Sequence, residues 1–197
     1  MTLANLDRRQ KRGGRLPRLI LVTDEVRLAD PLPAMRRLPP GAGVLLRHYG
    51  VAGRPALARQ LAQVARRRRL VLLVAGADWR LAAAVGAAGV HLPEALARQL
   101  ADPGLRLWQR RGHVLSIACH DRVALARARA QGADAAVLSP VFPTASHPGA
   151  PVLGAIRFAL WAGGAGLPVV ALGGVNRHTA KALRHAAGMA AIGGFSV

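Results

Sequence analysis

The chain has few cysteines and few aromatic residues for its length. Cys119 is the only cysteine among 197 residues, which excludes an internal disulfide framework and a cysteine-based zinc site. Aromatic residues make up only 4% of the chain, although hydrophobic residues reach 52%. The core must therefore consist mainly of Ala, Val and Leu, which suits helices packed on a buried parallel sheet.

Long apolar segments are also lacking. No apolar run approaches the roughly 20 residues that a membrane-spanning helix needs. The segment Met1–Arg15 is polar and basic and has no apolar stretch of the kind found in secretory signals. We therefore expect a cytoplasmic protein without membrane contact. Residues 1–16 are predicted to be a disordered basic segment, and residues 17–197 a single domain.

Acidic residues are scarce beside basic ones. The chain has 28 Lys and Arg against 9 Asp and Glu, a net charge of +19, and all but two of the basic residues are Arg. Such a charge can indicate a nucleic-acid surface. Outside Arg8–Arg15 and Arg66–Arg69, however, the arginines are scattered, with little aromatic interleaving for base stacking. We attribute the charge to compositional bias and expect nucleic acid not to be the partner.

Short apolar runs recur along the chain, each bounded by Gly, Pro or polar residues. They lie at residues 19–22, 44–46, 70–74, 89–92, 114–118, 135–138, 168–172 and 189–192. Runs of this kind are typical of strands buried on both faces. Eight such strands alternating with helices predict an α/β fold, a (β/α)8 TIM barrel. An open doubly wound sheet is the alternative.

Helical patterns separate several of these runs. They cover residues 54–67, 78–88, 121–131 and 176–187, and the last three begin at Asp78, Asp121 and Asn176 and stop before a glycine. The chain stops soon after the eighth run, so the final helix of the barrel is missing or truncated. The apolar surface that this would expose favours a homo-oligomer.

Two adjacent strand ends carry small polar residues or glycines. Ser139–His147 directly follows the sixth run, and Gly173-Gly174 closes the seventh. In parallel barrels, loops of this kind at the C-terminal ends of late strands form phosphate sites. The sequence therefore predicts a phosphorylated small-molecule ligand.

Four motifs together indicate a family. Leu21–Asp24, Gly89–Leu92, Ser139–His147 and Ala171–Asn176 have the order and spacing of the thiamine phosphate synthase and thiazole tautomerase superfamily, which the chain resembles from about Pro17 to Gly194. The synthase joins a pyrimidine methyl diphosphate to a thiazole phosphate with the help of Mg²⁺. The resemblance implies a TIM barrel and a role in thiamine biosynthesis.

Several positions match the binding residues of the superfamily. Arg47 occupies the place of an Arg near the diphosphate, and its alternative role is a solvated surface side chain. The thiazole phosphate would be held by hydroxyls and backbone N–H groups at Thr144, Ser146, Gly173, Gly174, Ile192 and Gly193. Ordinary turn chemistry is the alternative for the hydroxyls and the glycine pair.

The metal-binding positions do not match. Gly76-Ala77 replaces an Asn-Asp pair, and Leu96 replaces an Asp, so that no metal ligand is assigned. Asp78 and Glu94 lie nearby, but they suit helix starts. Because Mg²⁺ prefers hard oxygen ligands, the joint loss of two carboxylates argues against the magnesium-dependent synthase reaction. Although the family uses Mg²⁺, we expect this chain to bind neither Mg²⁺ nor any other cofactor.

The tautomerase branch needs no metal and uses a His whose place is taken here by Pro140. His147 is then the candidate acid or base, with His120 and His91 as alternatives. We expect a protein of the superfamily that binds a thiazole phosphate-type ligand at the C-terminal face of the barrel. Two alternatives stay open: a non-catalytic phosphate-binding or regulatory homologue, and a tautomerase-like proton-transfer enzyme.

Overall fold

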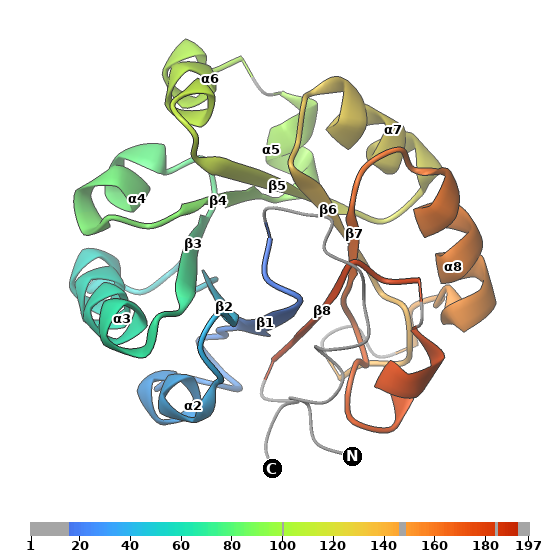
Figure 1. Cartoon of the computed structure of the whole chain (residues 1–197), viewed down its shortest axis with the longest axis horizontal. Helices are drawn as coiled ribbons and strands as arrows, with labels where there is room; N and C mark the ends of the chain where they lie inside the picture. The colour runs from blue at the N-terminus through green and yellow to red at the C-terminus, as the bar shows by residue number, and fades with distance from the viewer. Residues whose placement is uncertain (1–15, 100, 146–148, 184, 193–197) are drawn as a thin grey trace.

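A closed barrel of parallel strands forms the centre of the molecule (Figure 1). The computed structural model describes residues 16–192 except residues 100, 146–148 and 184. Within these residues the eight strands pair in chain order, and β8 pairs with β1, which confirms the barrel over the open sheet. The strands are β1 (Leu19–Val22), β2 (Gly43–Leu46), β3 (Val71–Ala75), β4 (Gly89–Leu92), β5 (Val114–Cys119), β6 (Ala135–Leu138), β7 (Val169–Ala171) and β8 (Gly188–Ala191).

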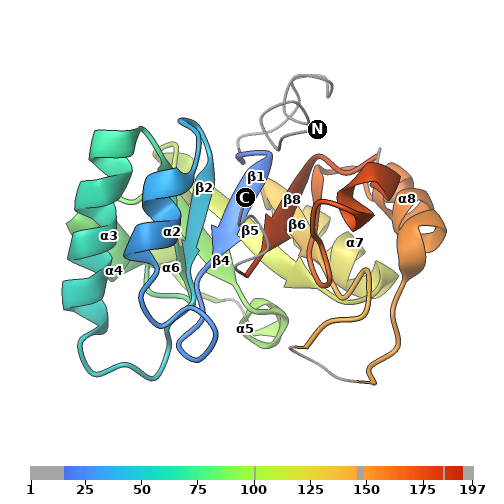
Figure 2. The ribbon, with the colours of Figure 1, turned by 90° about the horizontal axis from the view of Figure 1, so that it is seen from below.

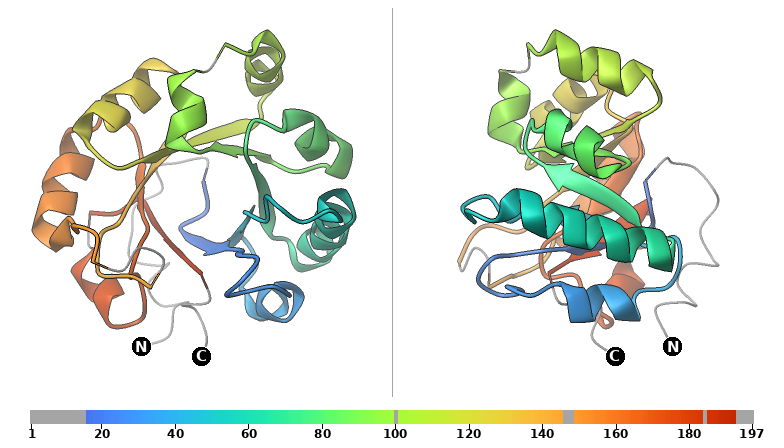
Figure 3. Two further views of the ribbon diagram at one scale, coloured as in Figure 1. Left: turned by 180° about the vertical axis from the view of Figure 1, so that it is seen from behind. Right: turned by 90° about the vertical axis from the view of Figure 1, so that its left-hand side faces the viewer.

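Helices surround the strands as an outer layer, which Figures 1 and 3 show from opposite sides. They are α2 (Leu32–Arg37), α3 (Arg54–Arg68), α4 (Trp79–Val85), α5 (Glu94–Arg98), α6 (Pro103–Arg110), α7 (Arg122–Ala130), α8 (Gly154–Gly164) and the 3₁₀ helix η1 (Thr179–Ala182). The described part of the chain ends at Ile192, one residue past β8, and contains no helix after that strand. None of the described helices is long and apolar enough to cross a membrane.

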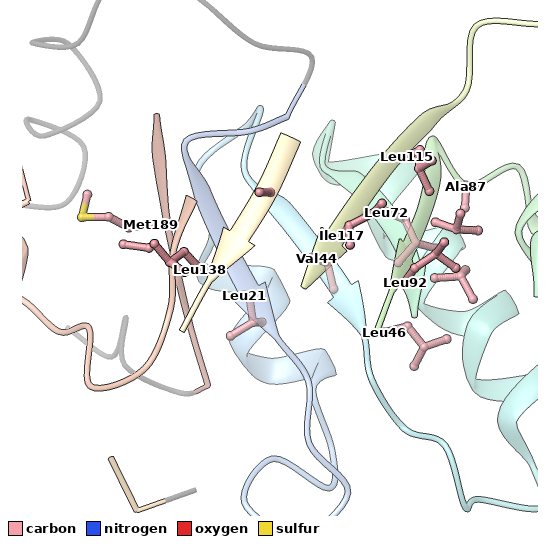
Figure 4. Packing of buried hydrophobic residues seen from close by; sticks show 14 of the residues in the cluster. Leu21, Val44, Leu46, Leu72, Ala87, Leu92, Leu115, Ile117, Leu138 and Met189 are labelled. Carbon is pink, nitrogen blue, oxygen red and sulfur yellow. The ribbon is translucent and has the colours of Figure 1, made fainter. Parts of the chain in front are cut away.

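Alternate residues of every strand except β4 enter two separate apolar clusters. Ile20, Leu45 and Leu73 belong to the cluster inside the barrel, whereas their neighbours Leu21 and Val44 belong to the larger cluster under the helices. Successive side chains of a strand point to opposite faces, so a strand buried on both faces reads as a continuous apolar run. Figure 4 shows part of the larger cluster, where Leu72, Leu92 and Leu115 lie close together.

Aspartates begin three of the helices. Oδ1 of Asp78 accepts a hydrogen bond from the N–H of Leu81 (3.1 Å), and Oδ1 of Asp121 accepts one from Ala124 (2.7 Å). Both caps agree with the sequence expectation, and Asp102 adds a third at α6. Each such cap stabilises its helix by about 1 kcal/mol. The sequence pattern gave no range for α2, α6 or α8, and it indicated α5 only through Glu94, its first residue.

The expected helix over residues 176–187 is not formed in the described residues. The structure has only η1 there. Oδ1 of Asn176 accepts hydrogen bonds from the N–H groups of His178 (2.8 Å) and Thr179 (3.1 Å), and Oγ1 of Thr179 donates to the carbonyl of Gly174 (2.9 Å). These side chains bind backbone groups locally and favour a compact turn over a regular helix.

Candidate functional site

A cavity of about 530 Å³ opens at the C-terminal end of the barrel. Its wall combines strand-end residues, such as Val22, Leu45 and Ala191, with residues of the loops that follow β4, β5, β6 and β7. Figure 2 shows the loops after β1 and β2 and helix α5 at this same end of the barrel. Ligand sites of TIM barrels lie at this end.

The barrel brings most of the sequence-predicted residues together at this cavity. Those that line it are Arg47, Thr144, Gly173, Gly174 and Ile192. They come from the segments after β2, β6, β7 and β8, up to 145 positions apart in the chain. Ser146, His147 and Gly193 lie outside the described residues, so the candidate acid or base His147 stays a prediction.

The Gly173-Gly174 pair lies directly against the loop after β6. A Cβ on Gly174 would come within 2.4 Å of the carbonyl oxygen of Pro143, and one on Gly173 within 2.8 Å of Cα of Pro140. Both glycines have positive φ, +90° and +63°, which side chains rarely adopt. The N–H of Phe142 also donates to the carbonyl of Gly173 (3.0 Å). The glycines therefore let two loops of the cavity wall pack together.

Asp24 holds two arginines at the cavity. Its Oδ2 lies 3.1 Å from Nη1 of Arg47 and 3.4 Å from Nη2 of Arg27, and both arginines line the wall. Burial by itself raises the pKa of Asp24, but hydrogen bonds from the N–H groups of Arg27 and Val26 outweigh it and leave the pKa below its ordinary value. One carboxylate thus faces two guanidinium groups, and this part of the wall has a net positive charge.

His91 is a buried, uncharged histidine in the cavity wall. Nδ1 of its ring lies 2.9 Å from Oγ of Ser116, and this hydroxyl also lies within hydrogen-bond distance of the carbonyl of Val90. Burial, followed by the positive charge of Arg47, lowers the pKa of His91 to about 4. His91 is therefore a neutral hydrogen-bonding group at neutral pH and a weak base.

His120 has a different environment in the same cavity wall. Its Nδ1 lies 2.7 Å from Oε2 of Glu94, the first residue of α5. Oε1 of Glu94 also accepts a hydrogen bond from Nη2 of Arg98 (2.5 Å). Burial by itself raises the pKa of Glu94, but the hydrogen bonds from Arg98 and His120 outweigh it and lower the pKa. Glu94 is therefore an anion that holds His120.

Arg54 bridges the ends of β2 and β3 next to the cavity. Its guanidinium donates to the carbonyls of His48 (2.7 Å) and Ala75 (2.5 Å) and to Oδ2 of Asp78 (3.1 Å). The Arg54 side chain is only 14% exposed. The Arg54 guanidinium therefore already binds these carbonyl and carboxylate oxygens at the ends of β2 and β3.

Comparison with known proteins decides the family. A sequence model of the family described as "Thiamine monophosphate synthase" matches residues 43–195, well over half of the chain. The chain belongs to the thiamine monophosphate synthase family. A thiamine-phosphate synthase of Methylobacillus flagellatus is 34% identical over 170 residues, which cover 82% of this chain and 76% of that protein.

A solved structure shows the same fold. The thiamine phosphate pyrophosphorylase of Pyrococcus furiosus superposes with a TM-score of 0.70 at 22% identity, over 89% of this chain and 85% of that one. The sequence resemblance and the barrel architecture thus agree with independent comparisons.

The positions that the sequence resemblance assigns to metal ligands hold residues that do not suit Mg²⁺. Gly76-Ala77 and Leu96 offer no side-chain oxygen. Asp78 is paired with Arg54, and Glu94 is paired with Arg98 and His120. Within the described residues no group of three or more His, Cys, Asp or Glu side chains is placed to hold a metal ion. A hard divalent cation needs several free oxygens, and these acids are already bound to cations.

Two features of the site were not found from the sequence. Arg27 carried no signal beyond its position three residues after Asp24, and the Glu94–His120 pair joins residues 26 positions apart. The sequence identified the two residues separately, Glu94 at a helix start and His120 as an alternative acid or base. Only the barrel, which sets β4 beside β5, places their side chains in contact.

Proposed function

We propose that this thiamine monophosphate synthase-family protein acts in thiamine biosynthesis by binding a thiazole phosphate-type ligand in the barrel cavity, and that it does so without Mg²⁺. The charge of the cavity wall carries this proposal. Among the described residues that line the cavity there is no Asp or Glu, whereas Arg27 and Arg47 both line it. A concave wall with guanidinium groups and no carboxylate attracts phosphate.

Backbone groups support the same assignment. Gly173 and Gly174 line the cavity, and within the described residues their N–H groups donate no hydrogen bond. Thr144 lies in the facing loop and also lines the cavity. Free N–H groups beside a hydroxyl are suited to the oxygens of a phosphate monoester. The glycine packing described above fixes the two loops relative to each other.

The proposal separates this chain from the magnesium-dependent reaction of the family. The family positions for metal ligands hold Gly76-Ala77 and Leu96, and Arg54 is bound to Asp78 beside them. A phosphate bound here would be neutralised by fixed side chains rather than by a metal ion. A purely regulatory phosphate-binding homologue would have the same cavity and is distinguished by its lack of any chemical step.

Calorimetry with thiazole phosphate tests the binding. We expect the same Kd in EDTA and in excess MgCl₂, and much weaker binding of the unphosphorylated thiazole alcohol. Removing one hydrogen bond to a charged group costs about 1.5–3 kcal/mol, so Thr144→Val and Arg47→Gln should each weaken binding by about 10-fold to 100-fold.

Arg59→Gln is the matched control for Arg47→Gln, because Arg59 is an exposed residue of α3 that does not line the cavity. It removes the same charge and should leave the Kd unchanged. Binding that requires Mg²⁺, or an equal loss of affinity in both arginine variants, would contradict the proposal.

A further inference from the structure

The Glu94–His120 pair has the geometry of a carboxylate that orients a reactive imidazole. Glu94 is only 9% exposed, and Oε2 lies 2.7 Å from Nδ1 of His120. The histidine side chain is 54% exposed and lines the cavity. One ring nitrogen is therefore fixed by a buried anion, and the same histidine is part of the wall of the cavity assigned to the ligand.

The charges around the pair keep the carboxylate ionised and in place. Oε1 of Glu94 lies 2.5 Å from Nη2 of Arg98 and 3.8 Å from Nη1 of Arg127. These contacts come from α5 and α7, which precede and follow His120 in the chain. An ionised carboxylate only accepts hydrogen bonds, so the proton of a neutral His120 ring lies on Nδ1 and the lone pair on Nε2.

The two described histidines that line the cavity differ in exposure and in their hydrogen-bond partners. His91 is enclosed, and its pKa of about 4 makes it a poor base. His120 is more than half exposed, and the carboxylate of Glu94 holds its Nδ1 and so fixes the orientation of the ring. A base held by a third group is the arrangement that general acid–base catalysis uses.

We propose that His120 is the catalytic acid–base residue of the cavity, with Glu94 as its positioning residue, and that the pair moves a proton on a phosphorylated heterocycle. This inference rests on the proposed function. As the C–H bond of the ligand breaks, its proton passes to Nε2 of His120 and the electron pair enters the conjugated ring system. The imidazolium then returns the proton to the ligand, so the overall change is a tautomerisation or, in D₂O, an exchange. No oxidant, reductant or metal is needed.

Proton NMR of thiazole phosphate in D₂O tests the base. We expect the full-length protein to accelerate exchange of a carbon-bound hydrogen of the ligand. His120→Gln should slow this exchange at least about 100-fold, the lower range for loss of a general base, while its Kd from calorimetry stays within about threefold. His185→Gln is the matched control, because His185 is exposed and does not line the cavity.

Nitrogen-15 NMR of the histidine rings tests the positioning role of Glu94. In the wild-type protein the neutral His120 ring should carry its proton on Nδ1. Glu94→Gln, which keeps the shape but removes the charge, should move the ring toward the tautomer protonated on Nε2 and slow exchange with little change in Kd. A carboxylate that served only stability would change the unfolding temperature and leave the tautomer as it is.

The outcomes separate the two proposals. Thiazole phosphate that gives no binding heat overturns the proposed function and, with it, the assignment of His120. Binding without accelerated exchange, exchange that survives His120→Gln, or a wild-type ring protonated on Nε2 overturns the assignment of His120 and Glu94 alone. Binding with exchange that is lost only in the His120 and Glu94 variants supports both.

Discussion

The two histidines of the cavity show how burial decides the chemistry of one residue type. His91 is a strand residue enclosed by the barrel and bonded to a neutral hydroxyl, so its charged form is disfavoured. His120 lies one residue past the neighbouring strand, is more than half exposed and faces a carboxylate. The same side chain is therefore a neutral hydrogen-bonding group in one place and an acid–base candidate in the other.

His91 makes the stability of the protein depend on pH. Its pKa falls from 6.5 in the unfolded chain to about 4 in the folded one. Between these values the unfolded chain binds a proton that the folded protein does not, so stability is lost as the pH falls from about 6.5 to about 4. Above 6.5 the effect vanishes. The loss through His91 by pH 4 is roughly 3 kcal/mol.

Urea unfolding at a series of pH values measures this loss. His91→Asn should be less stable at pH 7, yet lose roughly 3 kcal/mol less than the wild-type protein on acidification to about pH 4. His185→Gln, at an exposed position, should follow the wild-type curve. Parallel curves for the wild-type and His91→Asn proteins would show that His91 binds its proton equally well in both states.

Among the elements, α3 is tied to three neighbouring segments through a single side chain. Arg54, its first residue, joins the loop after β2, the end of β3 and the start of α4 through the carbonyls of His48 and Ala75 and the carboxylate of Asp78. Because Asp78 is 46% exposed, the ion pair itself contributes little, below about 1 kcal/mol. The two carbonyl bonds of the largely buried guanidinium should contribute more.

Arg54→Gln is expected to lower the free energy of unfolding by about 1–3 kcal/mol, because two buried carbonyls lose a charged donor. Asp78→Asn keeps a side chain that can cap α4 and should cost less than about 1 kcal/mol. Chemical denaturation of both single variants and the double variant measures the coupling between them. Arg59→Gln, in the same helix, should stay within about 0.5 kcal/mol of the wild-type protein. If the coupling energy between Arg54 and Asp78 equals the whole stability loss of Arg54→Gln, the ion pair rather than the carbonyl bonds accounts for that loss.

At the scale of the whole molecule, the excess of positive charge lowers the stability of the folded state. With 28 basic and 9 acidic residues, positive groups outnumber carboxylates about threefold. Like charges held on one folded surface repel one another more than in an expanded chain, and salt screens this repulsion. The charge thus acts on stability and on attraction of anionic ligands rather than on the fold.

Added salt is therefore expected to stabilise the protein. Raising NaCl from about 0.05 M to about 0.5 M shortens the screening length and should raise the Tm by about 2–4 °C, equivalent to about 1 kcal/mol for a domain of this size. Thermal unfolding followed by circular dichroism measures the change. A Tm that falls with NaCl would show that the surface ion pairs outweigh the repulsion.

Much of the barrel could be read from the sequence. A strand of a parallel barrel is covered on both faces, so each appears as a short apolar run, and the predicted runs at 19–22, 89–92 and 135–138 coincide with β1, β4 and β6. Asp78 and Asp121 marked helix starts because a side-chain cap depends only on residues three positions apart. The turn around Asn176 was misjudged because the same side chain can start either a helix or a compact turn.

The sequence by itself determined most of the strands, the family and several of the residues that line the cavity, because burial on two faces and the parallel order of strands leave local patterns. Only the tertiary structure decided which of those residues touch. Asp24 meets Arg47, and Glu94 meets His120, across gaps of more than 20 residues. Such pairs depend on which strands become neighbours and on the register between them, and neither is recorded in any short stretch of sequence.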